Sequence, residues 1–265
     1  MKYAWNITNV SDLRAKPDHG SERLSQLFFS EIVEIIKGQS PSFIKVRQSD
    51  GYEGWVYNAN LRELQNKDAD SFRSLPKSVV ISKTVKTYDN KSSQRPPYHI
   101  FYGTLLAVKS KNNNMTKLQL PNGDLIFIKS DKLRPIKDKN RHEATGTGLI
   151  DEAKKFIGIP YLWGGVTPLG FDCSGLVQAV YKSYGISLPR DTKDQIKTGV
   201  LVERDCIRTG DLLFFNRHVG LAIGKTKIIH ASRHSGGVRI ESLVKDEENF
   251  REDLANTFVE ARRII

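Results

Sequence analysis

The sequence predicts an α+β protein with a β-rich N-terminal half and a C-terminal half in which helices precede strands. Three observations lead to this prediction. Short apolar, β-branched segments alternate with turn residues up to about residue 137, an internal repeat runs through that region, and helical spacing begins near residue 148. The 265 residues, 38% of them hydrophobic, are enough for about two domains with real cores.

Residues 1–64 read as short strands joined by turns. The segment 31–36 is apolar and β-branched, and residues 43–47 alternate as a half-buried strand does. Asp50-Gly51 signals a turn before the next apolar segment, Gly54-Trp55-Val56-Tyr57. This spacing of strands predicts a small β-barrel.

A second stretch, residues 76–137, has the same texture and repeats part of the first. The pattern of a turn glycine, two core residues and a leucine occurs twice at a constant offset, as Gly51, Trp55-Val56 and Leu61, and as Gly123, Phe127-Ile128 and Leu133. Two barrels of one kind explain the repeat, although chance alone remains an alternative. The polar stretches 65–75 and 136–147 are expected to be linkers.

From residue 148 the spacing is helical. Leu149, Ile150, Ala153 and Phe156 fall on one helix face, with Thr147 as the expected cap. A second helix is predicted over 172–184, ended by Gly185. Four β-like segments follow, over residues 211–215, 219–223, 227–231 and 238–240.

Cys173 is a candidate nucleophile because it stands at the predicted start of the second helix. A helix N-terminus lowers the pKa of a thiol through its unpaired N–H groups, and only the thiolate attacks. The alternative is a small buried cysteine, which is common in helices. Cys206 is expected to be structural, and two cysteines make no disulfide framework.

A thiol nucleophile needs a base and a group that orients the base, and two histidines are placed for this. His218 opens one strand-like segment and His230 lies in the next, across a short turn at residues 225–226. A register slip of one residue would put His230 on the other face, so each histidine can also be an ordinary core or surface residue. The Cys and His spacings match no zinc pattern, so neither a metal nor a cofactor is expected.

Taken together, these segments resemble the NlpC/P60 family of papain-like cysteine peptidases, from about residue 146 to residue 265. The matching segments are Pro160-Tyr161-x-Trp163-Gly164-Gly165, Asp172-Cys173-Ser174-Gly175-Leu176, Leu188-Pro189-Arg190-Asp191, Gly210-Asp211-Leu212-Leu213-Phe214-Phe215, His218-Val219-Gly220 and Ile229-His230-Ala231. The resemblance implies Cys173 as nucleophile, His218 as base and His230 as the residue that orients His218. It also implies that Tyr161 lies beside the thiolate and helps to hold the oxyanion.

The two N-terminal stretches resemble bacterial SH3 domains, and the whole layout resembles family members that cleave murein peptides after D-Glu. The resemblance implies hydrolysis of the bond between γ-D-Glu and L-Lys or meso-diaminopimelate. The substrate would carry a free N-terminal L-Ala, and L-Ala-D-Glu would be released. The residues implied to contact the substrate are Glu22 and Tyr57 in the first SH3-like domain, and Asp172, Ser174, Asp191 and Thr192 in the peptidase domain.

Each of these contacts has a plainer alternative. Glu22 can be a solvated surface acid, Tyr57 an aromatic residue on the barrel face, and Asp191 the cap of the next helix. Thr192 stands where a serine is expected, and the hydroxyl is kept. Position 57 corresponds to Lys129 in the second repeat, so the barrel itself does not require a tyrosine there.

The formal charge of +11 comes from 41 Lys and Arg against 30 Asp and Glu, spread without a long basic run. This favours a basic surface over a nucleic-acid site. No apolar run is long enough to cross a membrane, and no signal peptide opens the chain, so we expect a cytoplasmic monomer that recycles free murein peptides. A chain trimmed of its leader would look the same, which keeps a secreted wall hydrolase open. A non-catalytic binding protein is the third alternative.

Overall fold

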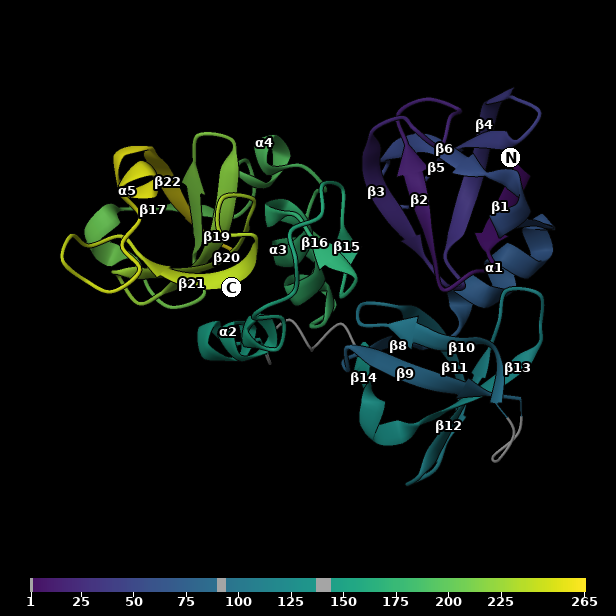
Figure 1. Cartoon of the computed structure of the whole chain (residues 1–265). Helices are drawn as coiled ribbons and strands as arrows, with labels where there is room; N and C mark the ends of the chain where they lie inside the picture. Colours follow the sequence, from purple (N-terminus) through teal and green to yellow (C-terminus); the bar gives the residue numbers. More distant parts are fainter. Residues whose placement is uncertain (1, 90–93, 137–143) are drawn as a thin grey trace. The chain divides into compact units, whose positions relative to one another are not determined.

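The computed structural model describes residues 2–89, 94–136 and 144–265, and the chain divides into two compact units, residues 1–137 and 138–265 (Figure 1). Each unit is described by itself. Among the described residues, no helix is long and apolar enough to span a membrane.

The first unit begins with a seven-stranded antiparallel sheet that curls into a barrel-like layer. Its strand order is β3-β2-β6-β5-β4-β1-β7. Alternating apolar residues face the core of this sheet, where Leu13, Val46 and Val56 are fully buried. The strands are β1 (Lys2–Asn6), β2 (Val10–Arg14), β3 (Arg23–Phe28), β4 (Ile32–Gln39), β5 (Phe43–Arg47), β6 (Glu53–Tyr57) and β7 (Leu61–Leu64), with the 3₁₀ turn η1 (Asn58–Asn60) before β7.

The second sheet of this unit repeats that topology strand for strand. Its order is β10-β9-β13-β12-β11-β8-β14, which is the first order with each strand number raised by seven. The turn glycines of the sequence repeat, Gly51 and Gly123, have φ of 89° and 88°, which explains why both copies need glycine there. The strands are β8 (Lys77–Val80), β9 (Thr84–Tyr88), β10 (Gln94–Phe101), β11 (Leu105–Lys111), β12 (Met115–Gln119), β13 (Leu125–Lys129) and β14 (Leu133–Ile136), with η2 (Ser130–Lys132) before β14.

The prediction of a linker over 65–75 is wrong. Residues Asn66–Ser74 form helix α1, which buries Ala69 and Phe72 and exposes its polar residues. Ala69 belongs to one apolar core together with Trp5 and Phe29 of the first repeat and Val80 and Leu118 of the second. The two repeats therefore share a core, because the connection between them is an amphipathic helix and not a free tether. Of the second predicted linker, residues 137–143 lie outside the described residues.

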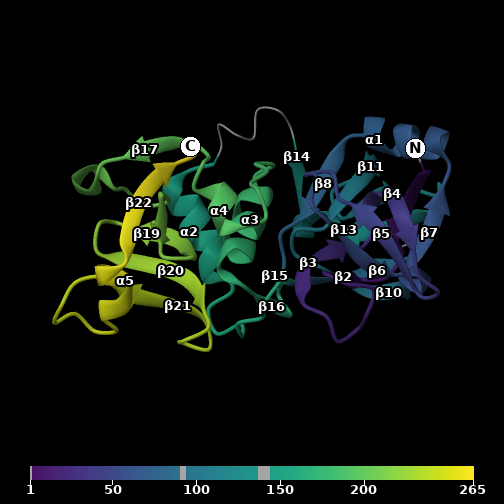
Figure 2. The same ribbon diagram turned by 90° about the horizontal axis from the view of Figure 1, so that it is seen from above.

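The second unit places helices beside an antiparallel sheet of order β17-β22-β18-β19-β20-β21 (Figure 2). Helix α3 packs against β19 and β20, which brings the start of the helix to the strands that carry the histidines. The elements are α2 (Gly146–Lys154), β15 (Val166–Thr167), β16 (Gly170–Phe171), α3 (Cys173–Lys182), α4 (Thr192–Gln195), β17 (Val200–Val202), η4 (Arg204–Cys206), β18 (Leu212–Phe215), β19 (His218–Ile223), β20 (Lys227–Ser232), β21 (Gly237–Ser242), α5 (Glu252–Asn256) and β22 (Phe258–Arg263).

The sequence placed α3 and the four strands β18–β21 correctly, and the chain leaves α3 through Gly185 at φ 74°. Thr147 is not the cap of α2. The side chain of Thr145 accepts the hydrogen bond from Gly148 N, so the helix begins two residues earlier than its apolar face suggests. Cys206, expected to be structural, is exposed.

Candidate active site

The start of helix α3 is held by Asp172. As N-cap it accepts a 2.7 Å hydrogen bond from Gly175 N and a 2.9 Å bond from Gly164 N. The buried guanidinium of Arg190 binds both carboxylate oxygens and also donates to Ser174 Oγ at 2.9 Å. An N-cap contributes about 1 kcal/mol, and leaving one partner of a buried ion pair alone costs roughly 3–5 kcal/mol. Asp172, the residue before Cys173, is therefore held both by backbone N–H groups and by the Arg190 side chain, which fixes the backbone at Cys173.

Two glycines allow the neighbouring loop to lie directly against this helix start. A Cβ at Gly175 would stand 2.1 Å from the carbonyl oxygen of Gly165. That same carbonyl accepts the N–H of Asp172 at 3.1 Å. Gly165 and Gly175 thus let the two backbone segments meet beside Cys173.

Cys173 is the first residue of α3 and is 9% exposed. Burial raises the pKa of its thiol, and the charge of Asp172 adds to the rise. The Thr192 hydroxyl, 3.8 Å from the sulfur, and the backbone of Val219 and Ser174 lower that pKa but do not offset the burial. The helix start was expected to lower this pKa, but the pKa is raised, because desolvation of the thiolate outweighs the hydrogen bonds that favour it.

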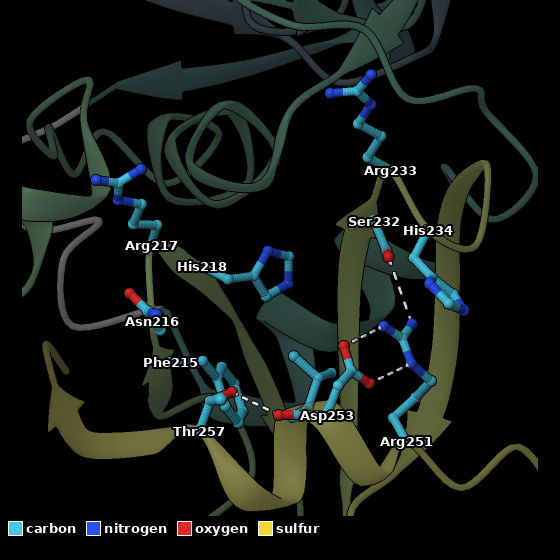
Figure 3. Close-up of a pocket in the computed structure, with 11 residues that line it drawn as sticks. Phe215, Asn216, Arg217, His218, Ser232, Arg233, His234, Arg251, Asp253 and Thr257 are labelled. Carbon is cyan, nitrogen blue, oxygen red and sulfur yellow. Dashed lines mark hydrogen bonds and ion pairs between the residues drawn. The ribbon is translucent and has the colours of Figure 1, made fainter.

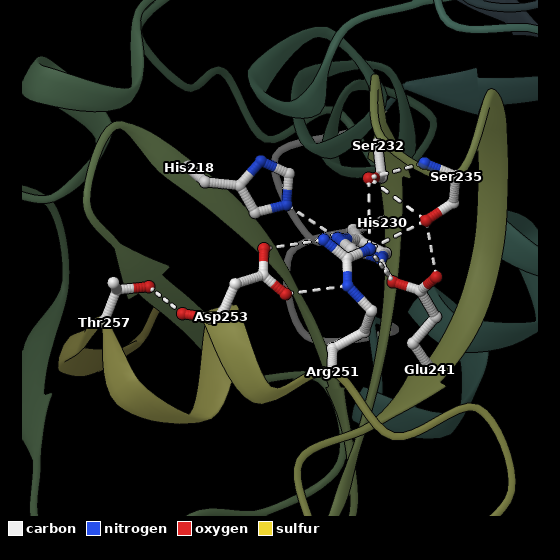
Figure 4. Close-up of polar contacts among 8 residues, drawn as sticks. All are labelled: His218, His230, Ser232, Ser235, Glu241, Arg251, Asp253 and Thr257. Atoms are coloured by element: carbon white, nitrogen blue, oxygen red, sulfur yellow. Dashed lines mark hydrogen bonds and ion pairs between the residues drawn. The ribbon is translucent and has the colours of Figure 1, made fainter.

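His218 and His230 lie on the same face of adjacent strands. His218 Nε2 is 2.6 Å from His230 Nδ1, a contact drawn in Figure 4, and the two rings meet edge to face. Gly220 makes this possible, because a Cβ there would come within 2.8 Å of His230 Cβ. The sequence left the register of β19 against β20 open, and the observed register puts both imidazoles on the same face.

The chain of hydrogen bonds continues to Glu241 on β21, a residue that the sequence analysis missed. His230 Nε2 is 2.6 Å from Glu241 Oε2, and Ser235 and Arg251 also donate to this carboxylate (Figure 4). Burial opposes ionisation of Glu241, but the hydrogen bonds from His230 and Ser235 and the charge of Arg251 outweigh it and lower its pKa to about 2. Glu241 is therefore an anion at neutral pH.

An anionic acceptor at the end of the chain sets both tautomers. Since Glu241 can only accept, His230 Nε2 carries its proton, and His230 Nδ1 is left to accept from His218 Nε2–H. His218 Nδ1 then holds the lone pair, and Figure 4 shows this nitrogen pointing away from His230. Burial, with the charge of Arg251, lowers the pKa of His218 to about 3. The resting pair is thus a neutral imidazole and a neutral thiol.

Tyr161 lies close to the nucleophile. Its backbone N–H bonds Gly236 O at 3.1 Å, and it forms a β-bridge with Phe171, two residues before Cys173. Burial raises the pKa of Tyr161, and the charges of Cys173 and Asp172 raise it further. The phenol therefore stays protonated and is available as a donor to an oxyanion beside the thiol.

The other predicted contacts in this unit have partners of their own. Ser174 is buried and bound to Arg190, and Asp191 stands at the N-cap position of α4 without a side-chain cap bond. Thr192 contacts the sulfur directly. That Asp172, Ser174, Asp191 and Thr192 also touch substrate stays a prediction, and the two Asp172 oxygens already accept bonds from Gly164, Gly175 and Arg190.

Glu22 lies at the end of the loop between β2 and β3, and Tyr57 is the last residue of β6 in the same SH3-like sheet. Tyr57, 37% exposed at the end of β6, packs against Phe43 and against His19 at 5.1 Å between ring centroids. His19 belongs to the same β2–β3 loop as the exposed Glu22, so this loop is tied to the tyrosine. No sequence motif had singled out His19. Glu22 and Tyr57 both belong to the unit that does not contain Cys173, and that they contact the substrate stays a prediction.

Comparisons with known proteins agree with this geometry. The NlpC/P60 family model matches residues 158–253, and the bacterial SH3 domain model matches residues 8–62. A gamma-D-glutamyl-L-lysine dipeptidyl-peptidase of Bacillus cereus is 31% identical over 89% of this chain and 72% of its own length. This chain belongs to the NlpC/P60 family. It is a cysteine peptidase of that family with an N-terminal bacterial SH3 domain, and the second repeat as a further SH3 domain stays a prediction supported by its strand order.

Other family relatives extend over nearly the whole chain. Dipeptidyl-peptidase 6 of Lysinibacillus sphaericus is 29% identical over 95% of both chains. The crystal structure of an NlpC/P60 family protein from Bacillus cereus superimposes with a TM-score of 0.84 at 25% identity, covering 98% of this chain and 99% of that one. The papain-like α+β fold expected from the sequence is confirmed.

Proposed function

We propose that this NlpC/P60 peptidase hydrolyses the bond between γ-D-Glu and the L-diamino acid of murein peptides that have a free N-terminal L-Ala, releasing L-Ala-D-Glu. The observation that carries the chemistry is the hydrogen-bonded chain from His218 through His230 to Glu241, in the unit that also holds Cys173. The substrate class is supported by relatives from Bacillus cereus and Bacillus subtilis that are named gamma-D-glutamyl-L-lysine dipeptidyl-peptidase.

The neutral resting pair determines how the reaction begins. Cys173 Sγ attacks the γ-carbonyl carbon while its proton moves to His218 Nδ1, the ring nitrogen that His230 does not occupy. The charge that develops on His218 is stabilised by His230, whose Nε2–H is bound to anionic Glu241. Moving the proton during the attack avoids a charged thiolate in a site where burial disfavours one.

The rest of the cycle uses the same groups. The proton on His218 passes to the leaving amine as the C–N bond breaks, which leaves an acyl-enzyme on Cys173. Water then gives a proton to His218 and attacks the thioester, and the thiol recovers its proton as L-Ala-D-Glu departs. The oxyanion of both tetrahedral intermediates receives hydrogen bonds from Tyr161 and from N–H groups at the helix start, each donor contributing about 3–4 kcal/mol.

Selection of a free amino terminus follows from charge in this proposal. An ammonium group taken out of water needs acceptors, and in this proposal the carboxylate of exposed Glu22 and the hydroxyl of Tyr57, both in the SH3 domain, provide them. A peptide whose amine is acylated or linked to glycan lacks that charge and is rejected. In this proposal the enzyme acts on free peptides in recycling and not on intact wall, and it works in the cytoplasm.

The experiment that tests this proposal compares three substrates: L-Ala-γ-D-Glu-L-Lys, its N-acetylated form and purified sacculi. We expect mass spectrometry to show L-Lys and L-Ala-D-Glu released from the free peptide much faster than from its N-acetylated form, with little release from sacculi. Preferential release of peptides from sacculi would instead support a wall hydrolase.

A further inference from the structure

A basic cavity of about 350 Å³ lies beside the catalytic base in the second unit (Figure 3). His218 lines it together with Asn216 and Arg217 from the β18–β19 turn, and with Arg233 and His234 from the β20–β21 turn. Arg251 and Asp253 form another wall. Nothing in the reaction described so far uses the two turn arginines.

The charge of the cavity is positive because only one of its arginines is neutralised from within. Arg251 holds Asp253 through two hydrogen bonds of 2.8 and 2.7 Å and also binds Glu241. Within the part of the chain that the structure describes, neither the Arg217 nor the Arg233 guanidinium forms an ion pair. Arg233 begins the turn between β20 and β21, and Gly236 of the same turn accepts the backbone N–H of Tyr161, so this turn lies beside the reaction centre.

Arg217 is the second residue of the two-residue turn that joins β18 to β19. Its φ of 58° lies in the left-handed region, where Gly, Asn and Asp are the common occupants. A tight hairpin turn commonly requires a positive φ, and this conformation fixes where the Arg217 side chain leaves the turn, directly before the catalytic base. Figure 3 shows Arg217 and Arg233 on opposite sides of the His218 ring, with their guanidinium groups directed away from it.

The leaving diamino acid of the substrate must lie next to His218 and the cavity during the reaction. His218 protonates the leaving nitrogen, so that nitrogen comes within about 3 Å of the imidazole. In a tripeptide the α-carboxylate carbon of the leaving residue is two bonds further on, about 2.5 Å from the nitrogen. A carboxylate therefore arrives next to the cavity that His218 lines, where two guanidinium groups are without an anion.

We propose that this cavity binds the free α-carboxylate of the leaving diamino acid through Arg217 and Arg233. The inference rests on the proposed function, since it names the part of the same substrate that the cavity recognises. It makes the enzyme selective for peptides that end at the diamino acid. The substrate has a second free carboxylate, on the D-Glu α-carbon, and the test separates the two.

The test measures kcat/KM for L-Ala-γ-D-Glu-L-Lys, for its C-terminal carboxamide and for the analogue amidated at the D-Glu α-carboxyl. The variants are Arg233→Gln and Arg217→Asn, alone and combined, with Asn chosen because it tolerates positive φ. The control is Arg239→Gln, an exposed arginine on the same hairpin that does not line the cavity. Matching melting temperatures confirm that each variant is folded.

We expect the wild type to prefer the acid over the carboxamide by about 10- to 100-fold, the range for a hydrogen-bonded charge. The double variant loses this preference by slowing on the acid alone, while Arg239→Gln keeps it. The inference is overturned if the double variant loses kcat/KM equally on the acid and the carboxamide, or if its acid-to-carboxamide ratio equals that of the wild type. It is also overturned if the effect of the variants disappears with the analogue amidated at D-Glu. If the wild type cleaves none of the three peptides, the proposed function fails as well.

Discussion

Glu241→Gln is the substitution that most sharply tests the chain of hydrogen bonds behind His218. Glutamine keeps the shape and one acceptor of the carboxylate but removes its charge. Glu241 is 2.6 Å from His230 Nε2 and is one of the groups that raise the pKa of His218. Without the anion, His218 becomes a weaker base, and the imidazolium formed during attack loses its counter-charge.

The magnitude follows from the bond that is lost. A buried hydrogen bond to a charged group is worth about 1.5–3 kcal/mol, which corresponds to a loss of about 10- to 100-fold in kcat/KM. The KM for the free tripeptide should change little, because Glu241 meets the charge that appears only as the reaction proceeds. The amide of glutamine can also donate to His230 and select the wrong tautomer, which would deepen the loss.

The assay follows L-Lys release from L-Ala-γ-D-Glu-L-Lys across pH. Glu260→Gln is the matched control. Glu260 is a partly buried acid on β22 of the same sheet, and it forms an ion pair with Arg262 and not with either histidine. Arg251 keeps Asp253 as a partner in the Glu241 variant, so the fold should persist. Activity within two-fold of wild type for Glu241→Gln would refute the assigned role.

Three further predictions concern single groups. Thr192→Val removes the hydroxyl 3.8 Å from the sulfur, so the thiol pKa should rise and alkylation of Cys173 by iodoacetamide should shift to higher pH; an unshifted profile would exclude that contact. Burial lowers the pKa of His218 from 6.5 to about 3, so the unfolded chain binds more protons in this window. The free energy of unfolding should therefore fall as pH drops from about 6.5 towards 3, and His218→Asn should flatten this dependence in denaturant titrations; equal slopes would contradict the shift. Glu22→Ala should raise KM for the free-amine peptide and narrow its advantage over the N-acetyl form, and an unchanged advantage would remove Glu22 from substrate binding.

Patterns within single elements could be predicted from the sequence. The alternation in β5, the apolar face of α3 and the turn glycines Gly51 and Gly123 are local features, and each corresponds to an observed element. The repeat across the first unit could also be found, because the same core positions recur at a constant offset. The resemblance to the family then placed Cys173, His218 and His230 in one unit.

What the sequence did not show depends on contacts between distant segments. Helix α1 looked like a linker because only Ala69 and Phe72 are apolar on its buried face. Glu241 was missed because its role needs the register of β20 with β21, where His230 pairs with Arg239 and Glu241 lies two residues further on the same face. The pKa of Cys173 was misjudged because the burial of the thiol depends on how β19 packs over the helix start.

The central claim is that Cys173 forms an acyl-enzyme with the L-Ala-γ-D-Glu half of a free murein tripeptide. Mass spectrometry of the acid-quenched enzyme during turnover of L-Ala-γ-D-Glu-L-Lys tests it directly, with Cys173→Ala as the comparison. We predict an adduct of L-Ala-D-Glu minus water on the peptide containing Cys173, and loss of turnover by at least about 10⁴-fold in the variant, as for other removed nucleophiles. Undiminished hydrolysis by Cys173→Ala, or an adduct on another residue, would contradict the account.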